Sequence, residues 1–400
     1  MQLNKPYLII DLDDNKIIFF VISYNKNKDY KLVKNIIIDS TGIQNGRIID
    51  VTIVSQLIKK TISKIEDEID YFFSHATIVI NPNNINCLNV SGYKRLNGSQ
   101  VSNENITYIL NDIKKIIITN EDKYSLIHLF NSNFSLDSDN LESLPIGLFG
   151  EFYNQNMTFF LAKKNILKNI KLVFIHCGIN IERILLKPFV EGINFLSKNQ
   201  LNKNFTIIKF KKKRISISLF KNKSYIFSED FDFGIDLIVK DIAKLCSLKF
   251  EEVEVLLKEI NLKNVIGNIN ESYLDKKYFP TSPYRKIKHQ LILDIISARV
   301  NELFEICYEK NSNLNYFKKN SNLIYINIEN GDYFKNIQFV LEKKELNNLE
   351  LVFNENFVES LTYASIGAAE LIGKGWEKEA IPVIHPKKSI ISSFFSRFFS

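Results

Sequence analysis

The stretch "TIIKFKKKRISISLF", residues 206–220, places four consecutive cations between two short apolar runs. Short runs rich in Ile, Phe and Leu favour strands, and the cations are expected to form the turn between them. The same layout occurs near the beginning of the chain, where "LIIDLDDNKIIFFVISY", residues 8–24, has an acidic turn instead. A third strand is expected after each pair, so the sequence predicts one β-meander in each half of the chain.

Helices are expected to follow both meanders. Residues 50–72 carry apolar side chains at helical spacing, and further helices are expected near 235–247 and 250–260. The expected strands lie at 7–12, 17–24, 30–38, 204–210, 215–220 and 225–231. In the stretch 215–220 apolar residues alternate with two serines, and this period of two indicates a strand. Two similar halves of this kind predict a duplicated α/β fold with a cleft between them.

Composition limits the class of protein. The 400 residues suffice for two or more domains, and 45% hydrophobic with 24% charged residues is typical of a globular protein. The net charge of +7 permits an anionic partner without requiring one. No signal peptide pattern opens the chain, and no apolar run approaches the ~20 residues that span a bilayer. The four cysteines form no CxxC pair, so we expect reduced thiols and neither a metal centre nor a redox motif.

Seven motifs, taken in order, resemble those of the FtsA family, the bacterial actin homologues that tether the FtsZ division ring to the membrane. They are "LIIDLDDNKI" (8–17), "GIQNGRIIDV" (42–51), "VSGYKRLNG" (90–98), "SLPIGLFGEF" (143–152), "CGINIERILLKP" (177–188), "FGIDLIVKDIAKLCSLKFEEVEVLL" (233–257) and "LILDIISARVNELFEI" (291–306). The resemblance covers nearly the whole chain. It implies a duplicated actin-like (ribonuclease H-like) α/β fold with an inserted 1C-type subdomain and a C-terminal amphipathic helix.

The resemblance also implies a division into subdomains. In the family's terms these are 1A at 1–81 and 160–200, 1C at 82–159, 2A at 201–230, 2B at 231–319, 2A with a return to 1A at 320–376, a linker at 377–388 and a membrane-targeting helix at 389–400.

The nucleotide motifs of the family are altered. Actin-like ATPases hold phosphates on two glycine-containing turns, because glycine lets the backbone approach closely. Here the first turn (13–16) has Asp13 and Asp14 at the family's glycine and threonine positions, and the second turn (211–214) reads "KKKR". The resemblance implies a degenerate nucleotide site made of Asp11, Lys16, Lys211, Lys212, Glu254 and Gly331.

We therefore expect a pseudo-ATPase with no catalytic or metal-binding residue, in which binding of ATP and Mg is lost or weakened. We also expect the acidic first turn and the basic second turn to attract each other. Two alternatives remain open: a weak ATPase, and a second turn that still grips phosphate through its lysine side chains. A nucleic-acid partner is not expected, since one basic turn without interleaved aromatic residues makes no binding face.

Residues 387–400, "KKSIISSFFSRFFS", have the pattern of an amphipathic helix. The apolar side chains recur at helical spacing on one face. The expected membrane contacts are Ile390, Ile391, Phe394, Phe395, Arg397, Phe398 and Phe399. An apolar face with basic neighbours suits a helix lying in an anionic membrane interface. The alternative is a helix that packs on the protein's own core.

Partners follow from the resemblance. The C-terminal peptide of FtsZ is expected to dock on 231–319, where its acidic residues would meet cations. The candidates are Arg285, Lys286, Lys288 and Arg299. The alternative for Arg299 is an internal ion pair with Glu302 or Glu305. Self-association into filaments and contact with late division proteins are expected through 1C.

The implied function is a division scaffold that is peripheral on the cytoplasmic face of the membrane at the division site. Two other classes compete with it: a working actin-like ATPase or sugar-kinase relative, and a PilM-like type IV pilus assembly protein. Intact glycine turns would favour the first. A terminal amphipathic helix argues against the second, because the pilus protein is not expected to carry one.

Overall fold

The computed structural model describes residues 5–198, 204–260, 272–315, 323–329, 331–344, 349–353 and 361–379. The chain divides into two compact units. The first unit comprises Met1–Lys203, Phe220–Phe227 and Leu361–Ser400, and the second comprises Asn204–Leu219 and Ser228–Ser360.

The main sheet of the first unit has the strand order β11-β6-β1-β2-β3. Its strands are β1 (Tyr7–Leu12), β2 (Lys16–Tyr24), β3 (Tyr30–Asp39), β6 (His75–Ile80) and β11 (Asn180–Leu186). The first three form an antiparallel meander, and β6 and β11 continue the sheet in parallel. Nearly every residue of β1, β2 and β6 is buried, as expected for strands that are covered on both faces.

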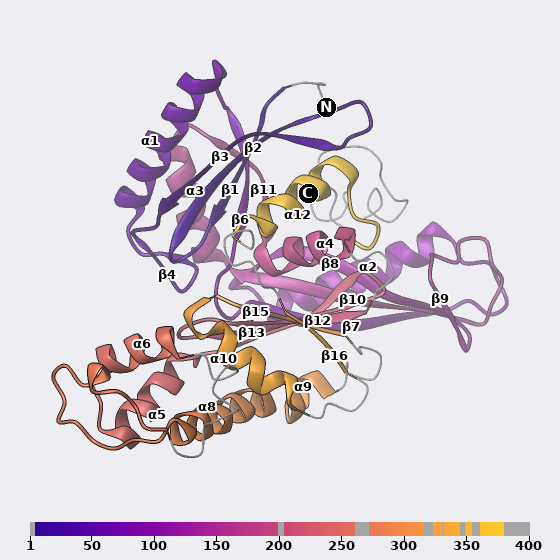
Figure 1. Cartoon of the computed structure of the whole chain (residues 1–400). Helices are drawn as coiled ribbons and strands as arrows, with labels where there is room; N and C mark the ends of the chain where they lie inside the picture. Colours follow the sequence, from indigo (N-terminus) through magenta and orange to yellow (C-terminus); the bar gives the residue numbers. More distant parts are fainter. Residues whose placement is uncertain are drawn as a thin grey trace. The chain divides into compact units, whose positions relative to one another are not determined.

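Helices cover both faces of this sheet (Figure 1). One side has α1 (Val51–Ile69) and α3 (Lys164–His176), and the other has α4 (Lys187–Lys198) and α12 (Tyr363–Lys374). The Asp50 side chain caps α1 by accepting the N–H of Ile53 at 2.9 Å. A small ribbon of β4 (Ile43–Gln44) and β5 (Arg47–Ile48) precedes α1.

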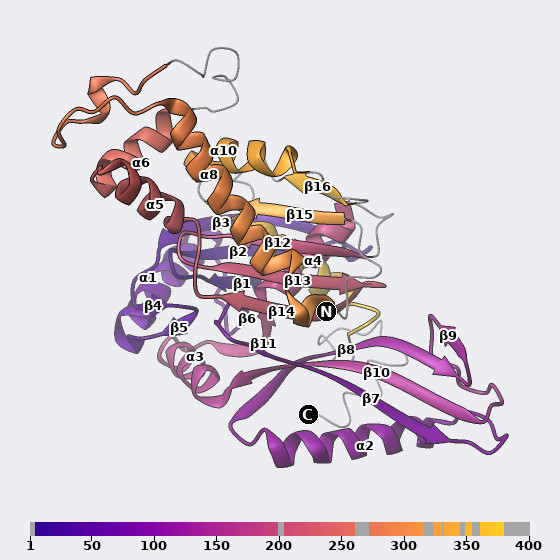
Figure 2. The same cartoon turned by 90° about the horizontal axis from the view of Figure 1, so that it is seen from below.

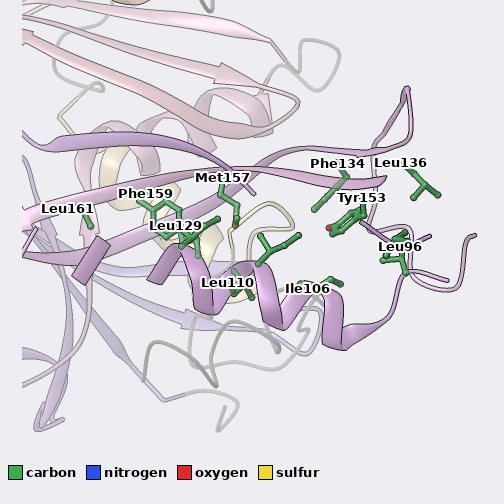
Figure 3. Packing of buried hydrophobic residues seen from close by; sticks show 13 residues of the cluster. Leu96, Ile106, Leu110, Leu129, Phe134, Leu136, Tyr153, Met157, Phe159 and Leu161 are labelled. Carbon is green, nitrogen blue, oxygen red and sulfur yellow. The ribbon is translucent and has the colours of Figure 1, made fainter. Parts of the chain in front are cut away.

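A second sheet within the first unit is antiparallel and has the order β7-β10-β8-β9. Helix α2 packs on it, and Leu110 of this helix points toward Leu129 and Met157 of the strands (Figure 3). The stretch expected to be an insertion, 82–159, therefore contains a sheet and an apolar core of its own. The elements are β7 (Asn86–Arg95), α2 (Asn103–Asn120), β8 (Tyr124–Leu136), β9 (Asp139–Leu141) and β10 (Phe152–Lys163).

The sheet that runs through the second unit has the order β14-β13-β12-β15-β16. Its strands are β12 (Phe205–Phe210), β13 (Ile215–Lys221), β14 (Ser224–Phe231), β15 (Leu323–Ile328) and β16 (Glu350–Phe353). Helix α8 lies beside α5 and α10 (Figure 2). The helices are α5 (Asp236–Cys246), α6 (Phe250–Glu259), η2 (Lys276–Tyr278), α8 (His289–Phe304), η3 (Glu305–Glu309), α9 (Ser312–Asn315) and α10 (Gly331–Glu342).

The two main sheets repeat one pattern. In each sheet, three strands that follow one another in the chain form a meander. Two later strands extend the sheet on the side of the first meander strand, and they run parallel to it. The predicted repeat of the meander is thus confirmed. The strand predicted at 215–220 is β13, and its two serines, Ser216 and Ser218, are buried at 8% and 4% exposure.

Within the described ranges, no helix combines the length and the apolar character needed to cross a membrane.

Candidate functional site

The first turn, between β1 and β2, carries two carboxylates that support its own geometry. The N–H of Asp13 donates to the carbonyl of Lys16 at 3.1 Å, which closes the turn. Asp13 Oδ1 accepts the N–H of Asp14 at 2.8 Å, and Asp14 Oδ1 accepts the N–H of Gly46 at 2.7 Å. The two acids therefore fix the turn and the neighbouring β4–β5 loop to each other.

Gly46 makes this contact possible. Its φ of 65° lies in the left-handed region, and a Cβ at this position would lie 2.0 Å from the carbonyl oxygen of Asn81. A larger residue would push the loop away from Asn81 and Pro82, so glycine is required here for steric reasons.

Lys187, the first residue of α4, places its ammonium group beside the first turn. Its Nζ lies 2.7 Å from Asp13 Oδ2 and 3.0 Å from Asp11 Oδ2, and Lys187 and Asp11 are 8% and 0% exposed. Burial alone would lower the pKa of Lys187, but Asp11 and Asp13 raise that pKa well above its ordinary value. Burial also raises the pKa of Asp11 to about 6, although Lys187 opposes this shift. The chain thus holds a buried ammonium ion between two carboxyl groups.

The sequence reasoning missed Lys187, although the residue lies within the motif "CGINIERILLKP". The signal available was one lysine that follows three apolar residues and precedes a proline. A lysine in such a run must either reach solvent or find buried acids. Its acids, Asp11 and Asp13, lie far away in the sequence, so the pairing could not be deduced from spacing.

The second turn, between β12 and β13, is tied to the beginning of α5. A hydrogen bond of 2.8 Å from the N–H of Lys211 to the carbonyl of Arg214 closes it. The carbonyl of Lys211 also accepts the N–H of Ile235 at 3.1 Å. A Cβ on Gly234 would lie 2.3 Å from that carbonyl oxygen, so glycine permits the close approach.

Three cations of the second turn have acidic partners in their own unit. The pairs are Lys211 Nζ with Glu329 Oε1 at 3.3 Å, Lys212 Nζ with Glu254 Oε1 at 3.0 Å, and Arg214 Nη2 with Asp230 Oδ1 at 2.5 Å. The structure therefore brings together the predicted site residues Lys212 and Glu254. Glu329 precedes Gly331 by two residues, and α10 begins at Gly331.

Lys16 forms an ion pair within its own sheet. Its Nζ lies 2.6 Å from Asp39 Oδ1 on the neighbouring strand β3, at the protein surface. Asp11 is instead paired with Lys187. A role of Asp11 and Lys16 in nucleotide binding stays a prediction, as does the attraction between the two turns.

The first turn does not fit a magnesium–phosphate group. The position between Asp11 and Asp13, where a cation would be held, is filled by the ammonium of Lys187. Asp13 and Asp14 would also place negative charge beside a phosphate. Among the residues that the structure describes, no group of three or more His, Cys, Asp and Glu side chains is placed to hold a metal ion.

The predicted partner residues of the second unit differ in their charge environment. Arg299 on α8 pairs with Asp241 through Nε and with Glu302 through Nη1, each at 2.5 Å. The alternative of an internal pair with Glu302 is thus confirmed. Arg285, Lys286 and Lys288 are exposed on the segment before α8, and no ion pair joins them to another described residue.

Glu252 of α6 holds that exposed segment in place. Its carboxylate accepts the N–H groups of Thr281 and Ser282 at 3.0 and 2.9 Å and both of their hydroxyl groups. It also accepts the N–H of Lys249 at 2.9 Å. Burial opposes the charged form, but these hydrogen bonds prevail and lower the pKa of Glu252 to about 2.

A buried cluster anchors the last described residues. Glu379 is 1% exposed and pairs with Arg183, and its Oε1 lies 2.5 Å from His128 Nδ1. His128 Nε2 accepts the N–H of Leu186 at 3.0 Å, so Nδ1 is the nitrogen that donates to the carboxylate. Lys378 is buried too, which differs from the linker expected from residue 377 onward. The remaining linker residues, 380–388, and all expected membrane contacts at 390–399 lie outside the described residues.

Comparison of the sequence with those of known proteins finds relatives at low identity. It is 20% identical over 312 residues to the cell division protein FtsA of Buchnera aphidicola subsp. Schizaphis graminum, covering 78% of this chain and 73% of that protein. It is 19% identical over 307 residues to FtsA of Neisseria meningitidis serogroup B, covering 76% and 74%. The chain is a distant homologue of FtsA. No protein-family model matches the sequence.

Among solved structures, the PilM-PilN type IV pilus biogenesis complex contains a chain similar to this homologue of FtsA. The TM-score is 0.52 at 12% identity, with 92% of this chain and 97% of that chain covered. A likeness at this identity shows the fold alone. The chain has the actin-like ATPase fold that its sequence predicted.

Proposed function

We propose that this chain is a cell-division scaffold of the FtsA type. It tethers FtsZ filaments to the inner face of the cytoplasmic membrane and recruits later division proteins to the division site. The observation that carries the proposal is the match to cell division proteins named FtsA over about three quarters of the chain. The chain's net charge of +7 favours association with an anionic surface.

The membrane contact is assigned to residues 389–400. Four phenylalanines and two isoleucines share one helical face there, with a basic pair before them. Six large apolar groups offer several kcal/mol of burial at about 25 cal/mol/Å², against the entropy of ordering the helix. The buried Glu379 supports this role, because its ion pair with Arg183 fixes the last described residue to the first unit.

The proposal includes weakened ATP binding. The first turn supports it, because it has no glycine whose backbone could approach a phosphate. The ammonium of Lys187 also occupies the position between Asp11 and Asp13 where a cation bound to that phosphate would lie. The scaffold is thus proposed to act as a pseudo-ATPase whose work is binding.

Two surfaces are proposed for partners. The C-terminal peptide of FtsZ, which is acidic and apolar in this family, is assigned to the second unit near the exposed cations Arg285 and Lys288. Self-association and late division proteins are assigned to the inserted sheet. Exposed apolar side chains support that assignment: Leu148, Phe149 and Phe152 are 51%, 69% and 47% exposed.

Vesicle sedimentation tests the tether. The full chain should sediment with vesicles of anionic phospholipid, and a variant that ends at residue 386 should not. Phe394→Glu with Phe398→Glu should act like the truncation, because both changes place charge on the apolar face. The matched control is Ser392→Glu with Ser396→Glu, which adds the same charge at the same spacing on the polar face and should sediment substantially more than the Phe variant.

A truncated chain that sediments as well as the full chain would refute the tether. A type IV pilus role would then gain support if the full chain also failed to bring FtsZ to the vesicles.

A further inference from the structure

The ammonium of Lys187 lies where the carboxylates of the first turn converge. Its Nζ is 2.7 Å from one oxygen of Asp13 and 3.0 Å from one oxygen of Asp11. Asp11 is fully buried, and the second oxygen of its carboxyl group, Oδ1, has no hydrogen-bond partner in the described part of the chain. Two carboxylates that face a common point are the kind of oxygen donors that bind a hard divalent cation.

We infer that Lys187 is a built-in cation, which takes the place of a divalent metal ion at the first turn and keeps Mg²⁺ from binding there. The inference deepens the proposed weakening of nucleotide binding and rests on it. It concerns only residues of the first unit: Asp11 and Asp13 as the acids and Lys187 as their counter-charge.

Electrostatics supports exclusion of a metal ion. A divalent ion between the two acids would lie within a few ångströms of a positive charge, in a region screened from water. The ammonium could vacate the position only by losing both carboxylates in a buried setting, and separating a buried ion pair is strongly unfavourable.

The backbone keeps the ammonium in place. Lys187 is the first residue of α4, and its neighbours Leu186 and Phe189 are 2% and 0% exposed. The main chain at Lys187 is therefore fixed in the core of the first unit. The side chain reaches the first turn from this fixed point and meets Asp11 and Asp13 directly.

A purely structural ion pair is the competing explanation. In that case Lys187 would merely neutralise two buried acids, and the site left after its removal would have no affinity for metal ions. The two explanations differ in what happens when the positive charge is removed and the acids are kept.

Binding of Mn²⁺, followed by the electron paramagnetic resonance signal of the free ion, separates them. The natural chain should bind no Mn²⁺ that depends on Asp11 up to millimolar concentration. Lys187→Met, which keeps the length of the side chain and removes its charge, should bind Mn²⁺ roughly tenfold or more tightly than the natural chain, and Mg²⁺ should displace it. Lys187→Arg keeps the charge and is the matched control that should bind none.

A second variant locates the ion. Adding Asp11→Asn to Lys187→Met should abolish the gained binding, because one of the two anionic donors is lost. If Lys187→Met folds only when Mn²⁺ or Mg²⁺ is present, the metal is replacing the missing charge, which also supports the inference.

Two results would overturn the inference. One is Mn²⁺ binding by the natural chain that Asp11→Asn removes. The other is a folded Lys187→Met that gains no Mn²⁺ affinity. A Lys187→Met variant that folds neither alone nor with Mn²⁺ or Mg²⁺ would count against the inference as well, because the metal ion then cannot take the place of the ammonium. These measurements contain no nucleotide and no vesicles, so ATP binding or loss of membrane binding would count against the proposed function without deciding this inference.

Discussion

Glu252 is a single residue whose carboxylate joins α6 to the surface segment that contains Thr281 and Ser282. Its five hydrogen-bond donors come from Lys249, Thr281 and Ser282, and they lower its pKa to about 2 from an ordinary value of 4.5. Because the folded-state pKa lies below that of the unfolded chain, the carboxylate stabilises the fold above about pH 4.5. The stabilisation is lost as the pH falls from about 4.5 toward 2.

Glu252→Gln should therefore destabilise the chain by on the order of 1–2 kcal/mol at pH 7, because all five donors lose an ionised acceptor and some of them would face the amide NH2 group. The gap in free energy of unfolding between variant and natural chain should narrow as the pH is lowered below about 4.5. Urea unfolding at several pH values measures it. Glu251→Gln, one residue away and exposed, is the control and should leave stability nearly unchanged. A gap that stays constant down to pH 3 would contradict the assignment.

The residue types of the two turns predicted part of the candidate site, but they did not indicate Lys187. The acids of the first turn and the cations of the second were visible in the sequence because each replaces a residue type that phosphate binding needs. Lys187 could not be identified, since its partners Asp11 and Asp13 precede it by more than a hundred and seventy positions. Pairing over that distance is set by the tertiary fold.

At the scale of elements, alternation and helical spacing predicted the strands and helices well, and burial less well. Both meanders, α1, α5 and α6 lie within a few residues of their expected bounds. The alternation did not indicate that the serines of β13 are buried, because a polar residue can be buried in a central strand when it is hydrogen-bonded there. The burial of Glu379 was missed for a similar reason: its partner His128 lies 251 positions earlier.

The segment before α8 gives a prediction for peptide binding. Arg285→Glu with Lys288→Glu should weaken binding of the C-terminal peptide of FtsZ roughly five- to tenfold, because two exposed cations facing an acidic peptide are reversed. Fluorescence anisotropy of a labelled peptide measures the affinity. Lys168→Glu with Lys171→Glu on α3 makes the same charge change in the first unit and should leave the affinity close to that of the natural chain.

Arg299→Glu should behave differently, since Arg299 already neutralises Asp241 and Glu302. Its reversal places three acids together and should lower the melting temperature.

Unchanged peptide affinity in the Arg285 and Lys288 variant would move the docking site to another surface.

At the scale of the whole molecule, the repeated meander was predictable from the sequence, whereas the inserted 1C-type subdomain stays an expectation that rests on the family resemblance. Two meanders and their helices leave a local pattern in the sequence, which can be recognised from the spacing of the apolar residues and from the turn residues. The second sheet has no such internal repeat, and its strands β7, β8 and β10 pair antiparallel with a helix between the first two. The pairing of strands separated by a helix is decided by packing of the apolar faces, which a linear pattern does not specify.

Thermal unfolding in the presence of Mg-ATP tests the whole chain as a nucleotide receptor. A ligand present at 100 times its dissociation constant stabilises a protein by about 2.7 kcal/mol. For a unit of roughly 200 residues this would raise the melting temperature by about 5 °C or more. We expect a rise below about 1 °C at millimolar Mg-ATP, because Lys187 compensates the acids of the first turn and the cations of the second turn are paired with Glu254, Glu329 and Asp230. Magnesium with tripolyphosphate is the control that detects binding of the phosphate groups without the nucleoside. A rise of several degrees with both ligands, removed by Lys211→Ala with Lys212→Ala, would show that the second turn binds phosphate through its side chains and that the pseudo-ATPase proposal is wrong.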